Sequence, residues 1–520
     1  MTRPIINNSI LIIYIMCAAL AGAEIFLPGM QPKEAGIEFA KVQQCKMCHG
    51  GTKNGEADPF FSWQGGMMAQ AAKDPVFRAA LAIAEQDVPG VGEYCFRCHT
   101  PRGWLEGRST PSDGSALNRE DMQGVSCDVC HRLVDPQSDR ARELIEHIPP
   151  GYGNAMIVAD PRNIALGPYG DSEGVARPHQ VEKSEYHASS QLCANCHNIS
   201  NPLLAEDVKT QPPYAYGHIE RTYSEWLLSD YANRGKEGTC QSCHYEQVEG
   251  GGQASRFGDL HRDYFVKHGP VGGSTWVQDV TWLLWKGQDM DKKAFEAGKK
   301  KALALLQTAA TLDLTQPSAQ QVKLRITNRT GHKLPNGYAE GRRMWVNVRF
   351  LDADGVLIKE IGKYDRREDL IFGEKVTVPT LLDPYQTTVY ECHPGLSPEQ
   401  AKKFNKKPGK SFHFVLNDVI VKDNRIPPEG FNNARFKEHL SEPVGATYQD
   451  GQYWDEIEYD LPEKCVKVQA RLMYQSVSWE YIKFLAEENR TDDWGKRLYE
   501  GWKQTGKCEP VVMASITKEI

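Results

Sequence analysis

The chain has 520 residues, of which 40% are hydrophobic and 25% charged, and its formal net charge at pH 7 is −7. This length exceeds what one hydrophobic core ordinarily supports, so at least two folding units are expected. The mixed composition excludes an intrinsically disordered chain, and the negative charge argues against a nucleic-acid-binding protein.

The first 23 residues have the pattern of an export signal. Arg3 supplies a positive charge, residues 10–20 are apolar, and residues 21–23 form a small-residue cleavage site. We therefore predict a signal peptide over residues 1–23 and a periplasmic or extracellular location. The apolar stretch is shorter than the ~20 residues that span a bilayer, so no membrane span is expected after cleavage. An uncleaved membrane anchor is the alternative.

Ten of the fourteen cysteines form five copies of the pattern Cys-x-x-Cys-His. This spacing is typical of c-type haem attachment, in which two thiols bond to the vinyl groups of one haem and the histidine binds the iron. Zinc sites and disulfide frameworks do not require a histidine after every cysteine pair. We predict five covalently bound haem c groups, held by Cys45, Cys48 and His49 (motif 1), Cys95, Cys98 and His99 (motif 2), Cys127, Cys130 and His131 (motif 3), Cys193, Cys196 and His197 (motif 4), and Cys240, Cys243 and His244 (motif 5).

Three other cysteines, Cys392, Cys465 and Cys508, remain after removal of the signal. Their odd number indicates at least one free thiol or an intermolecular link. We expect a disulfide between Cys465 and Cys508 that ties the tail of the chain to its last strand.

The hydrophobic pattern changes along the chain and predicts a multidomain fold. Residues 24–290 are expected to form a mainly helical and irregular pentahaem domain, in which the haems replace much of the conventional core. Residues 291–318 form a linker with an amphipathic helix over 292–308. Alternating segments at 321–328, 344–351, 356–361, 411–421 and 466–474 indicate an all-β, sandwich-like domain over 319–475, followed by a short helical tail over 476–520. A hairpin turn is expected at 352–355, where Asp352 and Asp354 are also candidate calcium ligands.

Six of the ten histidines outside the motifs lie in the haem region, which favours iron bound by two histidines. Three segments carry a resemblance: Pro178-His179 with Glu185-Tyr186-His187, then His218 with Tyr223-Ser224-Glu225-Trp226, and His268 before Gly272-Gly273. They resemble multihaem cytochromes c related to hydroxylamine oxidoreductase, pentahaem nitrite reductase and the tetrahaem cytochrome c of ammonia oxidisers. The resemblance implies that His179, His187, His218 and His268 are distal iron ligands, with His261 competing with His268.

Two further segments resemble this family. Residues 328–335, followed by 341–345, are similar to the segment that opens the β-domain, so His332 either reaches back to a haem or stabilises a turn. Residues 63–69 resemble the start of a ligand-bearing helix, but Met68 stands in the place of the histidine. Either Met68 binds one iron and raises its reduction potential, or Met67 and Met68 pack against a porphyrin face.

These observations predict an exported pentahaem cytochrome c that transfers electrons through mostly bis-histidine haems. Redox proteins are the expected partners, and self-association is left open. The alternative is an oxidoreductase acting on a small nitrogen or sulfur compound at one open-sided haem. All five motifs end in histidine, whereas the pentahaem nitrite reductases carry lysine at the active haem, so no catalytic residue is predicted.

Overall fold

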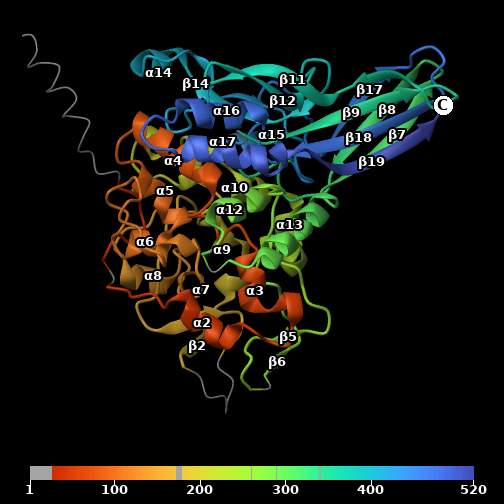
Figure 1. The fold of residues 1–520 in the computed structure, drawn as a ribbon. Helices are drawn as coiled ribbons and strands as arrows, with labels where there is room; N and C mark the ends of the chain where they lie inside the picture. Colours follow the sequence, from red (N-terminus) through yellow and green to blue (C-terminus); the bar gives the residue numbers. More distant parts are fainter. Residues whose placement is uncertain (1–25, 35, 171–177, 259, 289, 339–340) are drawn as a thin grey trace, which may run out of the picture.

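The computed structural model describes residues 26–34, 36–170, 178–258, 260–288, 290–338 and 341–520. The predicted signal peptide lies outside the described residues. Short helices fill the first half of the chain, and antiparallel sheets with two closing helices fill the second half, which confirms the predicted fold class. Figure 1 shows the motif helices below the β region and a long β arm that carries the C-terminus at its tip. None of the helices within these ranges is long and apolar enough to span a bilayer.

The haem-motif region consists of short helices joined by irregular segments. Its longest helix, α4, begins where Asp74 accepts hydrogen bonds from the amides of Val76 and Phe77 and where Pro75 occupies the first turn. The helices are α2 (Val42–His49), α3 (Pro59–Gln64), α4 (Pro75–Asp87), α5 (Gly92–His99), α6 (Pro101–Leu105), α7 (Cys127–Cys130), α8 (Asp139–Leu144), α9 (Ser190–Ala194), α10 (Thr222–Leu227), α11 (Cys240–His244) and α12 (Val277–Trp285). Short strand pairs are β1 (Ile164–Gly167) with β2 (Gln180–Lys183), β3 (Ile199–Ser200) with β4 (His218–Glu220), and β5 (Gly252–Gln253) with β6 (His261–Arg262).

The predicted linker helix is present as α13 (Lys292–Leu306). Its buried face packs closely on the haem region, because a side chain at Gly298 would collide with the backbone of Gly65 at the end of α3. The expected linker continues as a strand from Ala310, however. Leu312 and Leu314 of this strand, β7 (Ala310–Ser318), pair in register with β8, so the second half of the linker belongs to the β region.

The two main sheets face each other across a common apolar core. One has the order β10-β9-β18-β19 with β13 beside β9, and the other has the order β17-β8-β7. Alternate residues of β8, namely Val322, Leu324 and Ile326, are buried in this core, as the predicted strand pattern requires. The strands are β8 (Gln321–Asn328), β9 (Arg343–Leu351), β10 (Leu357–Ile361), β13 (Val389–Tyr390), β17 (Trp454–Asp460), β18 (Lys467–Gln475) and β19 (Val511–Glu519).

Smaller sheets and helices complete the β region. They are β11 (Tyr364–Ile371) with β12 (Glu374–Leu381), β14 (Cys392–Leu396) with β15 (Gly409–Lys410) and β16 (Val419–Asp423), α14 (Pro398–Lys403) and α15 (Asn433–Glu438). The strand expected over 411–421 begins only at Val419. Phe412 packs on Tyr481 and His413 binds Asp87, and these contacts hold the preceding residues away from the sheet.

The tail differs from the expected helical tail at its end. It contains α16 (Trp479–Glu488) and α17 (Trp494–Gln504), but β19 then returns along β18. The expected Cys465–Cys508 disulfide is wrong, because both thiols are free. Cys465 precedes the start of β18, whereas the Cys508 carbonyl accepts a hydrogen bond from Gln475 at its end. At about 3.3 Å per residue, a strand of this length separates the two cysteines by roughly 30 Å.

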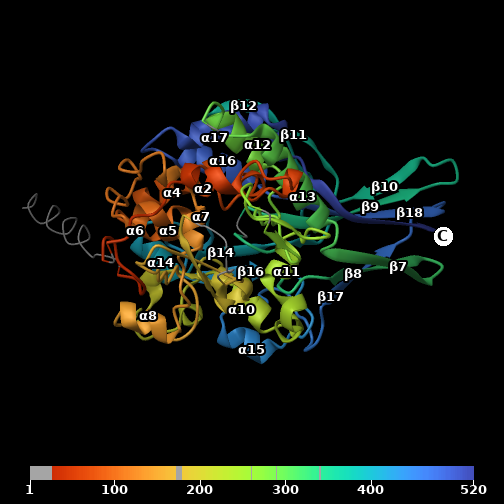
Figure 2. The same cartoon turned by 90° about the horizontal axis from the view of Figure 1, so that it is seen from below.

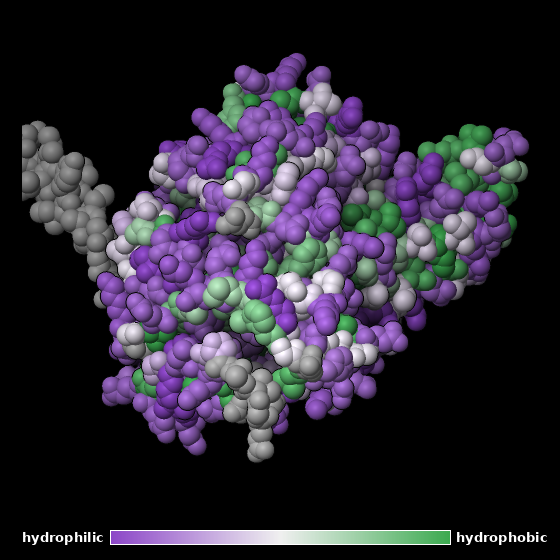
Figure 3. Space-filling view, turned by 60° about the horizontal axis from the view of Figure 1, so that its bottom comes forward, coloured by the Kyte–Doolittle hydropathy of each residue, from purple (hydrophilic) through white to green (hydrophobic). Residues whose placement is uncertain are grey.

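The arm ends in the predicted hairpin. The Asp352 carboxylate accepts hydrogen bonds from the amides of Asp354 and Val356, and Gly355 adopts a positive φ of 77°, so these residues form a turn. Figure 2 shows the arm projecting from the helical body, and Figure 3 shows apolar side chains on its surface. Val356, Leu357 and Ile358 are exposed beside this turn.

Candidate haem-binding sites

All five motif histidines share one hydrogen-bond arrangement. Each donates its Nδ1–H to an oxygen atom from another part of the chain, over 2.6–3.2 Å. Such a bond fixes the tautomer and orients the ring, which leaves Nε2 free as a metal ligand. The residues therefore fit an iron at every motif. The acceptors are the carbonyls of Ala254 for His49, Ala71 for His99, Leu166 for His131 and Val271 for His244, and the carboxylate of Glu220 for His197.

The motif cysteines also contact one another across the region. Cys45 of motif 1 lies beside Cys127 of motif 3. Cys98 of motif 2 lies beside Cys196 of motif 4. Cys193 of motif 4 lies beside Cys240 of motif 5.

Motif 3 adjoins motif 4, because Cys130 lies near Cys193 and Cys196. The motifs therefore follow the order 1–3–4, with motifs 2 and 5 both adjoining motif 4.

Three motif histidines face a second imidazole at a separation suited to one shared iron. An imidazole nitrogen binds a metal at about 2 Å, so two imidazoles on opposite sides of an iron have ring centres roughly 6 Å apart. The ring centres of His49 and His179 are 6.3 Å apart, and those of His244 and His332 are also 6.3 Å apart. In both pairs the second histidine binds a backbone carbonyl through Nδ1, at 3.1 Å for His179 and 3.0 Å for His332, which leaves its Nε2 free.

Two histidines compete for the position opposite His131. His268 lies at 6.4 Å and His187 at 5.9 Å between ring centres. His268 binds the Val266 carbonyl through Nδ1, whereas His187 donates Nε2–H to the Cys130 carbonyl and so occupies the nitrogen that would bind iron. The geometry favours His268 as the partner. His261 is exposed and uses its Nε2 on a loop carbonyl.

His99 and His197 differ from the other three. In the part of the chain that the structure describes, neither faces an imidazole at this separation, and the ring of Phe77 stacks on His99 at 3.7 Å. The Met68 carbonyl accepts a hydrogen bond from the amide of Ala71, whose own carbonyl binds Nδ1 of His99. The Met68 segment therefore lies on the Nδ1 side of that ring, away from Nε2.

His218 also lies apart from these three pairs. Its side chain is half-buried, with a buried Nδ1 that has no hydrogen-bond partner among the described atoms.

Burial keeps most of these imidazoles neutral, the protonation state that binds iron. Desolvation lowers the pKa of His99, His244 and His268 to about 4. His197 is the exception. Desolvation would also lower its pKa, but the hydrogen bond and charge of Glu220 outweigh it and raise the pKa to about 9.

Two buried cations lie beside motif 2. Lys73 and Arg78 are 2% and 6% exposed, and neither forms an ion pair with any described residue. Arg78 lies near His99. Lys73 is two residues after Ala71, whose carbonyl accepts the hydrogen bond from Nδ1 of His99. A buried charge ordinarily requires a partner of opposite charge. The carboxylate side chains of a haem are such partners, so this site also fits the group.

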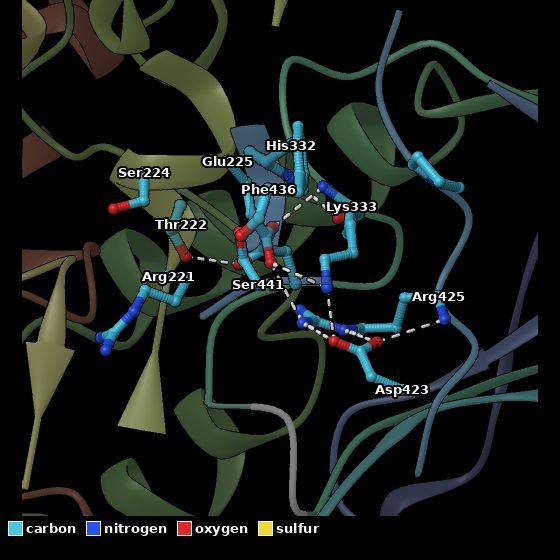
Figure 4. A network of polar contacts seen from close by, with 12 residues as sticks. Arg221, Thr222, Ser224, Glu225, His332, Lys333, Asp423, Arg425, Phe436 and Ser441 are labelled. Atoms are coloured by element: carbon cyan, nitrogen blue, oxygen red, sulfur yellow. Dashed lines mark hydrogen bonds and ion pairs between the residues drawn. The ribbon is translucent and has the colours of Figure 1, made fainter. Parts of the chain in front are cut away.

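A buried charge network lies next to His332 and joins the two regions of the protein. Figure 4 shows its four members, Glu225, Lys333, Asp423 and Arg425, pointing toward one another. Lys333 lies 2.5 Å from Asp423, and Arg425 contacts Asp423 at 2.7 Å and Glu225 at 3.0 Å. All four side chains are at most 3% exposed. Glu225 belongs to α10, so the network fixes the segment carrying His332 against the haem-motif region.

The sequence alone did not identify Glu220 or this network. Glu220 follows His218 by two residues on β4, a spacing that puts both side chains on one face of the strand. This spacing was the only available signal. Glu225 and Lys333 lie within segments that carry the family resemblance, but Asp423 and Arg425 have no such marker.

Comparisons with known proteins agree with this geometry. Residues 44–132 match the family model "Cytochrome c554 and c-prime". The fold is similar to the crystal structure of a penta-heme cytochrome c552 from Thermochromatium tepidum, with a TM-score of 0.53 and 15% identity over 94% of this chain and 100% of that chain. A search of curated proteins found no match. With the motifs and the β region, these findings show that residues 44–132 resemble cytochromes c of this family and that the whole fold is similar to that of a penta-heme cytochrome c.

Proposed function

We propose that the chain is an exported pentahaem cytochrome c that carries electrons through mostly bis-histidine haems. The iron of each haem, when bound, supplies a one-electron ferric/ferrous couple. The observation that carries the proposal is the set of three imidazole pairs with free Nε2 atoms, His49 with His179, His131 with His268, and His244 with His332. Two imidazoles on one iron leave no position for a substrate, which suits electron transfer.

The cysteine contacts support a branched route for electrons. Motif 4 would stand at the branch point, with motif 2 on one side, motif 5 on another, and motif 3 leading to motif 1. The branch ends reach the surface in places, since Met47 of motif 1 is 58% exposed and Cys243 of motif 5 is also exposed. Redox proteins docking near motifs 1 and 5 would exchange electrons there.

A second function is favoured by the two histidines that lack an imidazole partner. If the iron held by His99 or His197 keeps an open side, the protein would act as an oxidoreductase on a small nitrogen or sulfur compound. His218 is the proposed ligand still available to close one of these sites, because Nε2 of His187 is bound to a carbonyl and the Met68 segment lies on the far side of His99. If Met68 instead bound the iron of His197, it would give one His/Met iron of raised potential, since a thioether favours ferrous iron.

The haem count and the spin state test the proposal together. Mass spectrometry of the purified mature protein is expected to show five covalent haems and loss of residues 1–23. Low-temperature electron paramagnetic resonance is expected to show a majority of low-spin ferric haem. Fewer than five haems would contradict the pentahaem assignment, and a high-spin majority would contradict the carrier function.

Replacing each histidine that faces His131 identifies the ligand of motif 3. His268→Ala is expected to convert one haem of five to high spin, because it removes the imidazole whose Nε2 is free. His187→Ala is the matched control and is expected to leave that haem low-spin, since its Nε2 is bound to a carbonyl. The reverse result would assign the iron to His187.

A further inference from the structure

One motif histidine hydrogen-bonds an anion rather than a neutral group. Four of the five donate Nδ1–H to backbone carbonyls, whereas His197 donates to Oε1 of Glu220 at 3.2 Å. The backbone positions this carboxylate. β3 begins two residues after His197, and its Ile199 pairs with Glu220 at the end of β4. The contact is therefore fixed by the strand pair that follows motif 4.

The carboxylate is enclosed and held in place. The Glu220 side chain is 12% exposed. Its Oε1 accepts hydrogen bonds from Nδ1 of His197 at 3.2 Å and from the Thr222 hydroxyl at 2.8 Å. A carboxylate is ordinarily anionic at neutral pH, so a negative charge faces the ring of His197.

An anionic acceptor at Nδ1 has a direct effect on the other ring nitrogen. It draws the Nδ1 proton and increases the electron-donating strength of Nε2. A stronger donor stabilises ferric iron more than ferrous iron, so it lowers the reduction potential. The neutral carbonyls that face the other four histidines exert this effect more weakly.

We propose that Glu220 gives the haem of motif 4 the lowest reduction potential of the five. This inference rests on the proposed pentahaem function. Because motif 4 adjoins motifs 2, 3 and 5, the branch-point iron stays ferric while its neighbours are reduced, and each branch holds its electrons separately. The couple involves one electron at that iron, and the Nδ1 proton stays in the His197–Glu220 hydrogen bond in both oxidation states. Glu220 is thus a positioning and tuning residue that acts through His197.

The test is a redox titration of the complete haem-loaded protein, followed by visible absorption and electron paramagnetic resonance. Glu220→Gln keeps the length of the side chain and removes its charge, and Glu220→Asp keeps the charge and withdraws it from Nδ1. Both variants are expected to shift the lowest of the five transitions to higher potential and to leave the other four in place. Glu246→Gln is the matched control, because Glu246 lies two residues after His244 and pairs with Lys267 at the surface, without contacting a motif histidine.

Unchanged transitions in both Glu220 variants, or an equal shift in Glu246→Gln, would overturn the proposal. If both Glu220 variants lose one haem, the redox transition that disappears shows which haem was lost. Loss of the transition with the lowest potential of the wild-type five would support the proposal, and loss of any other transition would overturn it. Fewer than five haems in the wild-type protein would instead contradict the proposed pentahaem function, and the count is therefore made first.

Discussion

His332→Ala is expected to convert one iron in five from low spin to high spin. His332 faces His244 at 6.3 Å between ring centres, and its Nδ1 is engaged by the Lys333 carbonyl, so its Nε2 is the atom available to iron. Removing it opens the sixth position of the haem held by motif 5. The measurement is the high-spin signal in low-temperature electron paramagnetic resonance, normalised to the haem content.

Added imidazole serves as the internal control for this prediction, because it is expected to enter the vacated position and restore the low-spin signal. His147→Ala is the control variant, since this histidine is 63% exposed and faces no motif histidine in the described structure. A His332→Ala protein with an unchanged spectrum would show that His332 is a turn residue.

Asp423→Asn is expected to destabilise the protein by about 3–5 kcal/mol, the typical cost of breaking a buried ion pair from one side. The substitution keeps the shape of the side chain but leaves Lys333 and Arg425 with only Glu225 as counter-ion. The measurement is chemical denaturation of the haem-loaded protein. Glu456→Gln is the control, because its pair with Arg325 lies at the surface and should contribute less than about 1 kcal/mol. Equal effects of the two substitutions would contradict the role of the network.

Asp423 also predicts a pH dependence. Burial alone would raise its pKa, but Arg425 and Lys333 hold it well below the ordinary value. A carboxyl whose pKa is depressed by folding contributes stability above its unfolded pKa of about 4 and loses it as the pH falls below that value. The wild-type protein should therefore lose stability between about pH 4 and pH 2 faster than Asp423→Asn does. Parallel pH profiles of the two proteins would contradict this assignment.

The sequence was most informative where local spacing alone decides the structure. The fixed spacing within each motif predicts five haem attachment sites, and the alternating pattern over 321–328 matches β8. The same reasoning could not show what each motif histidine contacts, because the acceptors come from distant segments. The Ala254 carbonyl, for example, lies 205 positions from His49.

Distance along the chain also explains the expectations that were wrong. The Cys465–Cys508 disulfide was expected to tie the tail to the last strand, but Cys465 precedes β18 and Cys508 lies beside the far end of that strand. The strand β19 at the end of the tail appears only through its pairing with β18. The buried network likewise joins residues up to 200 positions apart, which no local pattern reveals.

The central claim, five haems of which at least three are bound by two histidines, is tested most directly by near-infrared magnetic circular dichroism of the fully oxidised protein. The position of the low-spin ferric band distinguishes bis-histidine from histidine–methionine iron, and its intensity gives the number of each per chain. The account predicts at least three bis-histidine haems in a total of five. Two or fewer would contradict it.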